Sequence, residues 1–234
     1  MASRLTKAER KAAKSLAQAR RDQLIERHLA SPKSKKSYLL CSGSVLCGDE
    51  VVMVGKNRLN HVFACEGDPS VHAVEYGPLY VGVCLDSTEQ KVRFDAIVRL
   101  EDNQREFRVV RMNRRQTFEI QERAAKALGG TFRVIDKAWL KQHGLRIQNW
   151  RRALTVHRIC KRSSYAHIKG HVLQLLNVHG RMTFGALLLL YSKENRPYLL
   201  AALVELISSR KVISDLDYRP WSLHTTVSLR GDAT

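Results

Sequence analysis

The sequence predicts an α/β protein that combines a mixed β-sheet with a helical C-terminal unit. Two observations carry this prediction. Between residues 71 and 135, short apolar segments with two-residue alternation are separated by a turn cluster and one helical stretch, which is typical of a mixed sheet. After residue 165, apolar residues recur at helical spacing in three segments, and two short strand-like segments follow. The 234 residues are enough for one large domain or two small ones.

The strands of the sheet are expected at residues 79–83, 92–100, 105–111 and 131–135. The turn cluster at residues 101–104 makes the third strand the hairpin partner of the second. Alternation places Asp95 on one face of its strand with Arg93, Ile97 and Arg99, opposite an entirely apolar face. It also places Val109 and Arg111 together on one face of the next strand. A helix over residues 116–128 connects the third strand to the fourth.

The last 70 residues predict a winged helix, with helices over 167–179, 183–192 and 197–209 and strands on either side of residues 217–220. Thr183 is the expected N-cap of the second helix. The third helix would read DNA bases in such a fold, but after Arg196 it has no Lys, Arg, Asn or Gln. We therefore expect a protein-docking module. Its expected partner-binding residues are Tyr198, Leu199, Leu203 and Trp221.

Two alternatives stay open for this C-terminal unit. Trp221 lies between two expected strands and can equally belong to the core. The unit can also bind only the DNA backbone, through Arg210, Lys211 and Arg219.

The composition favours an anionic polymer as partner, because 40 Lys and Arg against 22 Asp and Glu give a net charge of +18. The N-terminus lacks the apolar core of a signal peptide, and the longest aliphatic run, residues 186–190, is far shorter than a membrane span. We expect a cytoplasmic, nucleoid-associated protein with no membrane partner. The five cysteines are odd in number and lack Cys-x-x-Cys spacing, which favours reduced thiols and no zinc site.

The basic residues are concentrated in two regions. Residues 1–36 predict a basic, Ala-rich helical arm, which either lies on DNA or a partner or is simply solvated. From Lys137 to Lys193 there is no Asp or Glu, which favours binding to a phosphate backbone over an ordinary surface of mixed charge. The candidate DNA-binding residues in and around this stretch are Arg146, Arg151, Arg152, Arg158, Lys161, Arg162 and Lys169.

Several segments together resemble the TnsA-like endonucleases of heteromeric transposases. They are Asp-Pro-Ser-Val (68–71), Phe-Asp-Ala-Ile-Val (94–98), a strand ending at Arg111, and Arg-Ala-Ala-Lys-Ala-Leu-Gly-Gly-Thr-Phe-Arg-Val-Ile (123–135). The resemblance covers about residues 50–140 and continues more weakly to the C-terminus. It implies a restriction-endonuclease-like core that cuts the 5′ ends of a transposon, beside a DDE-type transposase and an AAA+ ATPase.

The resemblance also implies a metal site, made of a Glu on an early helix, an Asp on a strand and a Glu-x-Lys strand. Asp95 matches the Asp, but Val109 and Arg111 stand at the Glu and Lys positions, and the early Glu position falls near Arg58. One Asp among arginines is a poor Mg²⁺ site, and Arg stays protonated. We expect a vestigial Asp95 and no metal cofactor, with Mg²⁺ required only if the nuclease is active.

Two alternatives stay open for this site as well. Glu119 or Glu122 on the following helix can supply a missing ligand, or Asp95 can simply pair with Arg93.

These inferences predict four parts: a basic arm (1–36), a restriction-endonuclease-like core (37–145), a basic linker (146–164) and a winged-helix docking domain (165–234). The expected function is a DNA-binding, TnsA-like component of a transposition complex that is inactive as a nuclease. It would hold the double-stranded transposon ends and bridge them to the transposase. The alternatives are an active metal-dependent endonuclease that cuts the 5′ ends, and a general nucleic-acid-binding regulatory protein.

Overall fold

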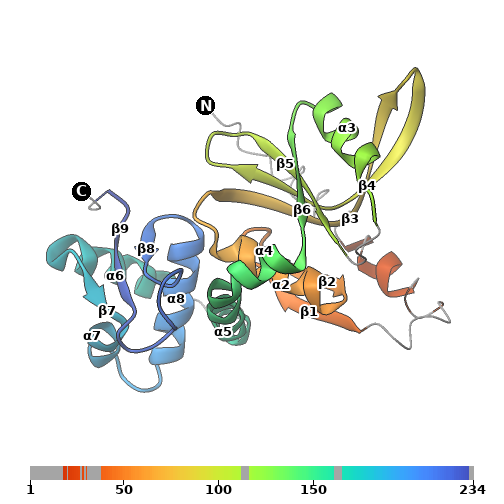
Figure 1. Ribbon diagram of the computed structural model, residues 1–234. Coiled ribbons are helices and arrows are strands. Elements are labelled where there is room, and N and C mark those ends of the chain that lie inside the picture. Colours follow the sequence, from red (N-terminus) through yellow and green to blue (C-terminus); the bar gives the residue numbers. More distant parts are fainter. Residues whose placement is uncertain are drawn as a thin grey trace.

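The computed structural model has an α/β architecture, with three sheets among the residues that it describes (Figure 1). It describes residues 18–19, 21–26, 28, 30, 38–111, 116–160 and 165–231. Within the expected N-terminal arm, the described residues are helical, and Arg21 donates to Asp49 at 3.2 Å. The remainder of the arm lies outside the described residues. No helix in the described part of the chain is long and apolar enough to cross a membrane.

The central sheet has the strand order β3-β4-β5-β6 and is mixed, as the sequence predicts. Its strands are β3 (Val71–Leu85), β4 (Thr88–Leu100), β5 (Arg105–Val110) and β6 (Thr131–Ile135). β3, β4 and β5 are antiparallel neighbours, whereas β5 and β6 are parallel because α3 (Glu119–Ala127) carries the chain back between them. The register of β3 against β4 shifts near Gly77, where a Cβ atom would lie 2.6 Å from the Phe94 carbonyl oxygen.

Alternate residues of β5 point to opposite faces of this sheet. Phe107 and Val109 pack against α3 on one face. Arg108 and Val110 lie on the other, where α2 (Lys56–Gly67) covers the sheet. A two-stranded ribbon of β1 (Leu39–Gly43) and β2 (Glu50–Val54) packs beside α2.

Helix α5 (Gly144–Cys160) occupies most of the segment expected to be a basic linker, so that expectation is wrong for residues 146–160. Its residues Trp150, Ala153 and Leu154 are buried, and the helix packs against both α2 and α8 (Arg196–Ser208). These buried residues form an apolar stripe at helical spacing, which in the sequence is interspersed with cations. The short helix α4 (Lys137–Gln142) leads into α5, and its N-cap, Asp136, accepts from the Trp139 N–H at 2.8 Å.

The C-terminal unit contains three helices and a small antiparallel sheet of order β7-β9-β8. Its elements are α6 (Ala166–His179), β7 (Met182–Thr183), α7 (Phe184–Leu189), α8, β8 (Val212–Ser214) and β9 (Thr226–Leu229). Thr183 caps α7 as predicted, because its hydroxyl accepts from the Ala186 N–H at 3.1 Å.

This unit is joined to the rest of the protein by a shared core and by polar contacts. One apolar cluster runs from Phe63 of α2 through Trp150 of α5 to Leu203 of α8. Arg210, which follows α8 with a φ of 62°, donates to the backbone oxygens of Asp68 and Val71. The two parts of the chain are therefore packed as one body rather than connected by a tether.

Candidate nucleic-acid interface

Asp95 lies where β4 and β5 stop pairing, one residue beyond the last pair between Ala96 and Arg108. Its side chain is 5% exposed, and both carboxylate oxygens are occupied. Oδ2 accepts the Val110 N–H at 2.8 Å, in place of the next rung of the ladder. Oδ1 accepts from Arg58 Nε at 2.8 Å and from Arg93 Nη2 at 3.1 Å. Asp95 is thus the salt-bridged Asp that one alternative expects, with Arg58 as a second partner.

The residues around Asp95 do not fit a magnesium ion. Mg²⁺ needs oxygen ligands in octahedral geometry, whereas here a single carboxylate is neutralised by two guanidinium groups. Arg58 is held in place, because its Nη1 also donates to the Val54 oxygen at 3.1 Å. Among the described residues, no group of three or more His, Cys, Asp or Glu side chains is arranged to hold a metal ion.

The other residues expected near the metal site lie in different surroundings. Val109 is buried in the apolar cluster beneath α3. The Arg111 guanidinium lies over the Phe118 ring, 5.2 Å from its centroid. Glu119 and Glu122 are exposed in the first turn of α3, whereas the arginines that hold Asp95 come from α2 and β4. The described contacts of Asp95 include neither of these carboxylates.

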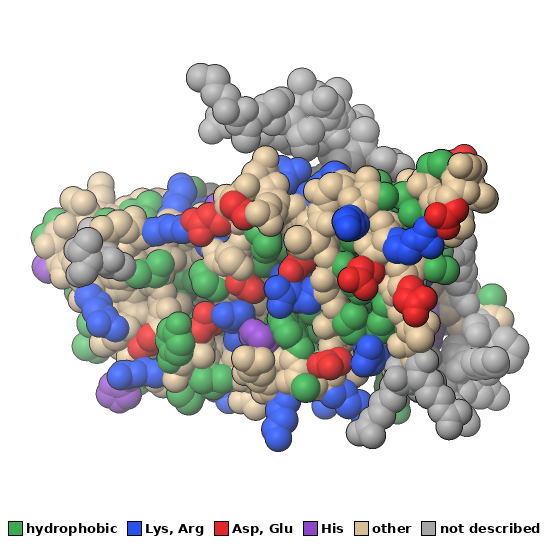
Figure 2. Space-filling model, turned by 45° about the horizontal axis from the view of Figure 1, so that its top comes forward, with side chains coloured by type: hydrophobic (Ala, Val, Ile, Leu, Met, Phe, Trp, Pro, Cys, Tyr) green, Lys and Arg blue, Asp and Glu red, His purple; other side chains and the backbone are tan. Residues whose placement is uncertain are grey.

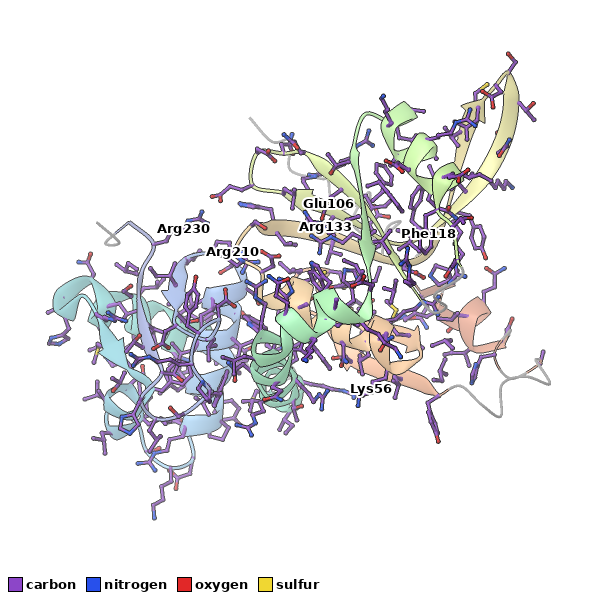
Figure 3. All side chains as sticks on the ribbon, in the orientation of Figure 1. Lys56, Glu106, Phe118, Arg133, Arg210 and Arg230 are labelled. Atoms are coloured by element: carbon purple, nitrogen blue, oxygen red, sulfur yellow. The ribbon has the colours of Figure 1, made fainter. Side chains whose placement is uncertain are left out.

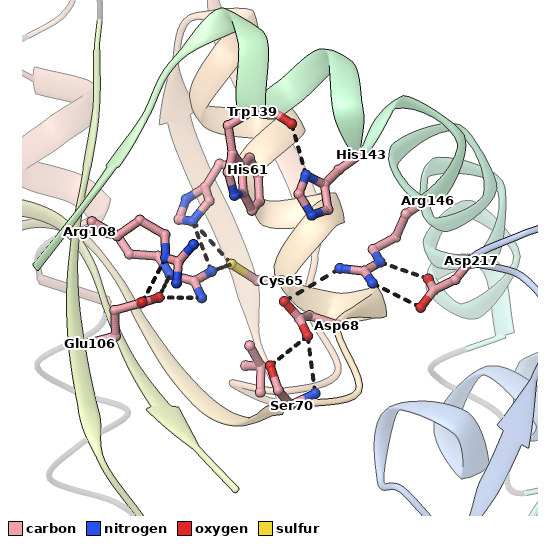
Figure 4. A network of polar contacts seen from close by, with 12 residues as sticks. His61, Cys65, Asp68, Ser70, Glu106, Arg108, Trp139, His143, Arg146 and Asp217 are labelled. Carbon is pink, nitrogen blue, oxygen red and sulfur yellow. Dashed lines mark hydrogen bonds and ion pairs between the residues drawn. The ribbon is translucent and has the colours of Figure 1, made fainter. Parts of the chain in front are cut away.

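A buried polar network lies between β5 and α2 (Figure 4). Glu106 accepts from Arg108 Nε at 2.6 Å and from Arg133 Nε at 2.7 Å. Arg108 also donates to Cys65 Sγ at 3.3 Å, and His61 Nε2 lies 3.2 Å from the same sulfur. Burial raises the pKa of the Cys65 thiol to about 11, so this sulfur is no nucleophile at neutral pH. Burial and the Arg108 charge lower the pKa of His61 well below its usual value, so the ring stays neutral.

Arg146, one of the candidate DNA-binding residues, is occupied within the fold (Figure 4). Its Nε and Nη2 donate to the two carboxylate oxygens of Asp217 at 2.7 and 2.9 Å, and its Nη1 lies 3.4 Å from Asp68. Burial opposes ionisation of Asp68, but hydrogen bonds from Ser70 and the Arg146 charge outweigh it and lower the pKa of this carboxyl. Arg146 is therefore a structural residue that ties α5 to the C-terminal unit.

Lys169 is also occupied, because it donates to Glu205 of α8 at 2.6 Å. The same carboxylate accepts from the Tyr165 hydroxyl at 2.5 Å and lies 3.1 Å from His157 Nε2. Burial opposes ionisation of Glu205, yet the hydrogen bonds from Lys169, Tyr165 and His157 lower its pKa overall. Cations of the acid-free stretch therefore form ion pairs with Asp and Glu residues from other parts of the chain. Of the other candidate residues, Lys161 and Arg162 lie outside the described residues.

Arg151, Arg152 and Arg158 remain exposed on α5. Arg151 and Arg158 fall on one face of the helix, seven residues apart. Arg158 lies 3.3 Å from Glu50 and keeps about half of its side chain exposed, at 51%. Arg151 donates to Asn60 at 3.3 Å. These are the candidate residues that the fold leaves available to an anionic ligand.

The face of α5 that carries Arg151 and Arg158 borders a hollow of about 440 Å³ between α5, α2 and β1. Lys56, the first residue of α2, contributes a third cation (Figure 3). The lining also includes Tyr38, which is 80% exposed, and the side chain of Phe63. The sequence does not predict Lys56 and Tyr38 as DNA-binding residues, because neither belongs to a motif or to the acid-free stretch.

The positive charge does not cover the whole surface. Figure 2 shows Lys and Arg interspersed with Asp and Glu on the face that it presents. The hollow beside α5 is therefore a local concentration of cations, and this makes it the candidate interface.

The assignment of Leu199 and Leu203 to partner binding is wrong, because both are residues of α8 whose side chains are fully buried in the core. Trp221 packs edge-on against Phe184, with ring centroids 5.1 Å apart, and Tyr198 packs against the same core. The apolar stripe of α8 faces inward and builds the C-terminal unit.

Comparison with known proteins adds no family to these observations. No protein-family model matches the chain, and a search of curated proteins found no relative.

Proposed function

We propose that this protein is a DNA-binding, TnsA-like component of a transposition complex that holds transposon-end DNA without cutting it. It would bridge the double-stranded ends to a DDE-type transposase and an AAA+ ATPase, in the cytoplasm and in association with the nucleoid. The contact between Arg58 and Asp95 carries this proposal. The resemblance aligns both residues with metal ligands of the nuclease family, and the two side chains do meet, at 2.8 Å, but as an ion pair.

The architecture supports the resemblance at the level of fold. A mixed sheet with one helix on each face is compatible with a restriction-endonuclease-like core. The order α6-β7-α7-α8-β8-β9 is compatible with a winged helix, in which β8 and β9 would form the wing. The DNA-binding part rests on the net charge of +18 and on the exposed arginines of α5.

The partner-docking part now rests on different residues. Leu189 and Tyr218 are 81% and 84% exposed in the C-terminal unit, and Leu190 and Leu223 are exposed as well. Exposed apolar and aromatic side chains are the usual anchors of protein interfaces. We assign contact with the transposase to these side chains in place of Leu199 and Leu203.

Strand-nicking measurements test the proposal. The full chain is mixed with transposon-end DNA, the co-encoded transposase and either Mg²⁺ or Mn²⁺, and cleavage at the 5′ ends is followed on sequencing gels. We expect stable complexes with the end DNA and no 5′ nick above that of the transposase alone. Nicking that disappears in Asp95→Ala while circular dichroism shows this variant to be folded would instead establish the active endonuclease.

A further inference from the structure

We infer that the hollow beside α5 binds an unpaired nucleotide of a DNA strand, next to the duplex that the protein holds. The inference rests on the proposed function and specifies the part of the DNA that this site would take. It concerns Tyr38, Lys56, Phe63, Arg151, Leu154 and Arg158, which line one depression although they come from three places in the chain, namely the start of β1, α2 and α5.

The size and lining of the hollow suit a base. Its volume of about 440 Å³ lies within the range of roughly 300–1,000 Å³ that is typical of small-ligand sites. Phe63 and Leu154 are buried and form an apolar floor. A paired base is covered by its neighbours in the stack and cannot enter such a depression, whereas an unpaired base can turn into it.

The rim of the hollow suits a phosphate. Lys56, Arg151 and Arg158 line it, and none of the described lining residues is Asp or Glu, although Arg158 lies 3.3 Å from Glu50 of β2. Arg151 keeps its guanidinium 5.7 Å from the Phe63 ring centroid, so a cation already lies against the aromatic floor. Cations beside an apolar floor match the two halves of a nucleotide, which are a flat aromatic base whose faces stack and a charged phosphate.

Tyr38 supplies a surface for stacking. It lies directly before β1 and is 80% exposed, so its ring is open to a stacking partner. Single-strand binding sites combine a cationic groove with aromatic rings on which bases stack. Tyr38 lines the hollow and is therefore placed to stack on a base that enters it.

The test compares two DNA duplexes that differ only in a short single-stranded extension at one end. Binding to the full chain is measured by fluorescence anisotropy, with 2-aminopurine as the first unpaired base to report stacking. We expect the extension to tighten binding about tenfold, or about 1.4 kcal/mol, since one base would stack on an aromatic ring. Tyr38→Ala should remove this gain, measured against blunt-duplex binding by the same variant, and Tyr38→Phe should keep it.

Matched variants make the result specific. Tyr218→Ala removes an equally exposed tyrosine outside the hollow and should keep the gain. Arg151→Ala should reduce the gain from the extension more than Arg152→Ala does, because Arg152 lies on the same helix but does not line the hollow.

The outcomes separate the two proposals. Binding of the blunt duplex with no gain from the extension would overturn the inference about the hollow and leave the proposed function standing. A gain that survives Tyr38→Ala and Lys56→Ala would overturn the inference as well. Failure to bind either DNA would overturn the proposed function, and the inference with it.

Discussion

The surroundings of Asp95 and the hollow beside α5 both gather arginines, yet they differ in what neutralises the charge. At Asp95, two guanidinium groups meet one buried carboxylate, and all of these charges are used within the fold. At the hollow, Arg151 and Lys56 are exposed and no described lining residue is Asp or Glu, while Arg158 lies 3.3 Å from Glu50 and keeps half of its side chain exposed. A count of arginines therefore does not identify a nucleic-acid interface. The acids that reach each arginine in space decide whether it serves the fold or a ligand.

The largest expected effect concerns the neutralised site. Asp95→Ala leaves Arg58, which is only 15% exposed, without its carboxylate, and it also leaves the Val110 N–H unpaired. We expect the free energy of unfolding to fall by about 3–5 kcal/mol, as when one partner of a buried ion pair is removed. Urea denaturation followed by circular dichroism measures this change. Arg93→Ala is the control, because Arg93 is 44% exposed and its loss should cost less than about 1 kcal/mol. Equal effects of the two variants would contradict the comparison.

A smaller loss of stability should separate two arginines of the same helix. Arg146→Ala removes a bidentate pair with Asp217 and should lower the free energy of unfolding by about 2 kcal/mol, the range for hydrogen bonds between charged groups. Arg152→Ala, at an exposed position of α5, should change it by less than about 0.5 kcal/mol. Thermal unfolding of both variants tests this difference. If Arg146→Ala weakens DNA binding at unchanged stability, its assignment to the fold fails.

The exposed arginines of α5 should affect DNA binding rather than stability. Arg151→Ala combined with Arg152→Ala should weaken binding to all duplex sequences alike. The log–log salt dependence should flatten by about 1.8, or about 0.9 for each phosphate that the double variant no longer neutralises. Titrations at several salt concentrations with two unrelated sequences provide the measurement. Weaker binding to only one of the sequences would show that these side chains read bases.

The smallest effect is a pH dependence from His61. Its pKa in the folded protein is lowered by burial and by Arg108, so the unfolded chain takes up a proton below its ordinary pKa of about 6.5 while the folded chain does not. His61 therefore does not reduce the free energy of unfolding above that pH. As the pH decreases toward the folded pKa of His61, the free energy of unfolding falls by at most about 1.4 kcal/mol per pH unit. His61→Leu should flatten this slope between about pH 6.5 and 5.

The control for this slope is His179→Gln, which replaces an exposed histidine at the end of α6. It should leave the pH dependence as it is in the unmodified protein. Equal slopes in the unmodified protein and in His61→Leu would show that His61 does not stay neutral.

The positions of most elements follow from local patterns in the sequence. Alternation around Asp95 predicts β4, and Thr183 predicts the start of α7, because strand periodicity and capping depend on neighbouring residues alone. The nature of α5 does not follow as readily. Its buried face is spread over Trp150, Ala153 and Leu154 among many cations, and the partners of that face lie in α2 and α8, far away in the chain.

The candidate site is predictable only in part, for the same physical reason. Arg151 and Arg158 stand out in an acid-free stretch, but Glu205 and Asp217, which pair with other cations of that stretch, come from the C-terminal unit. Pairing across such distances depends on tertiary packing. The burial of Leu203 is hidden likewise, because an apolar stripe looks the same whether it meets a partner protein or its own core.

Helix α5 connects the hollow rigidly to the C-terminal unit. One of its faces borders the hollow with Arg151 and Arg158, and other residues of the same helix pack on α8 and pair with Asp217. A packed helix transmits displacement as a lever, because its length is fixed by its own hydrogen bonds. A force on a DNA strand bound at one face would therefore displace the C-terminal unit, where the proposed transposase contact lies. Under the proposed function, α5 would thus couple the DNA-binding face mechanically to the transposase contact.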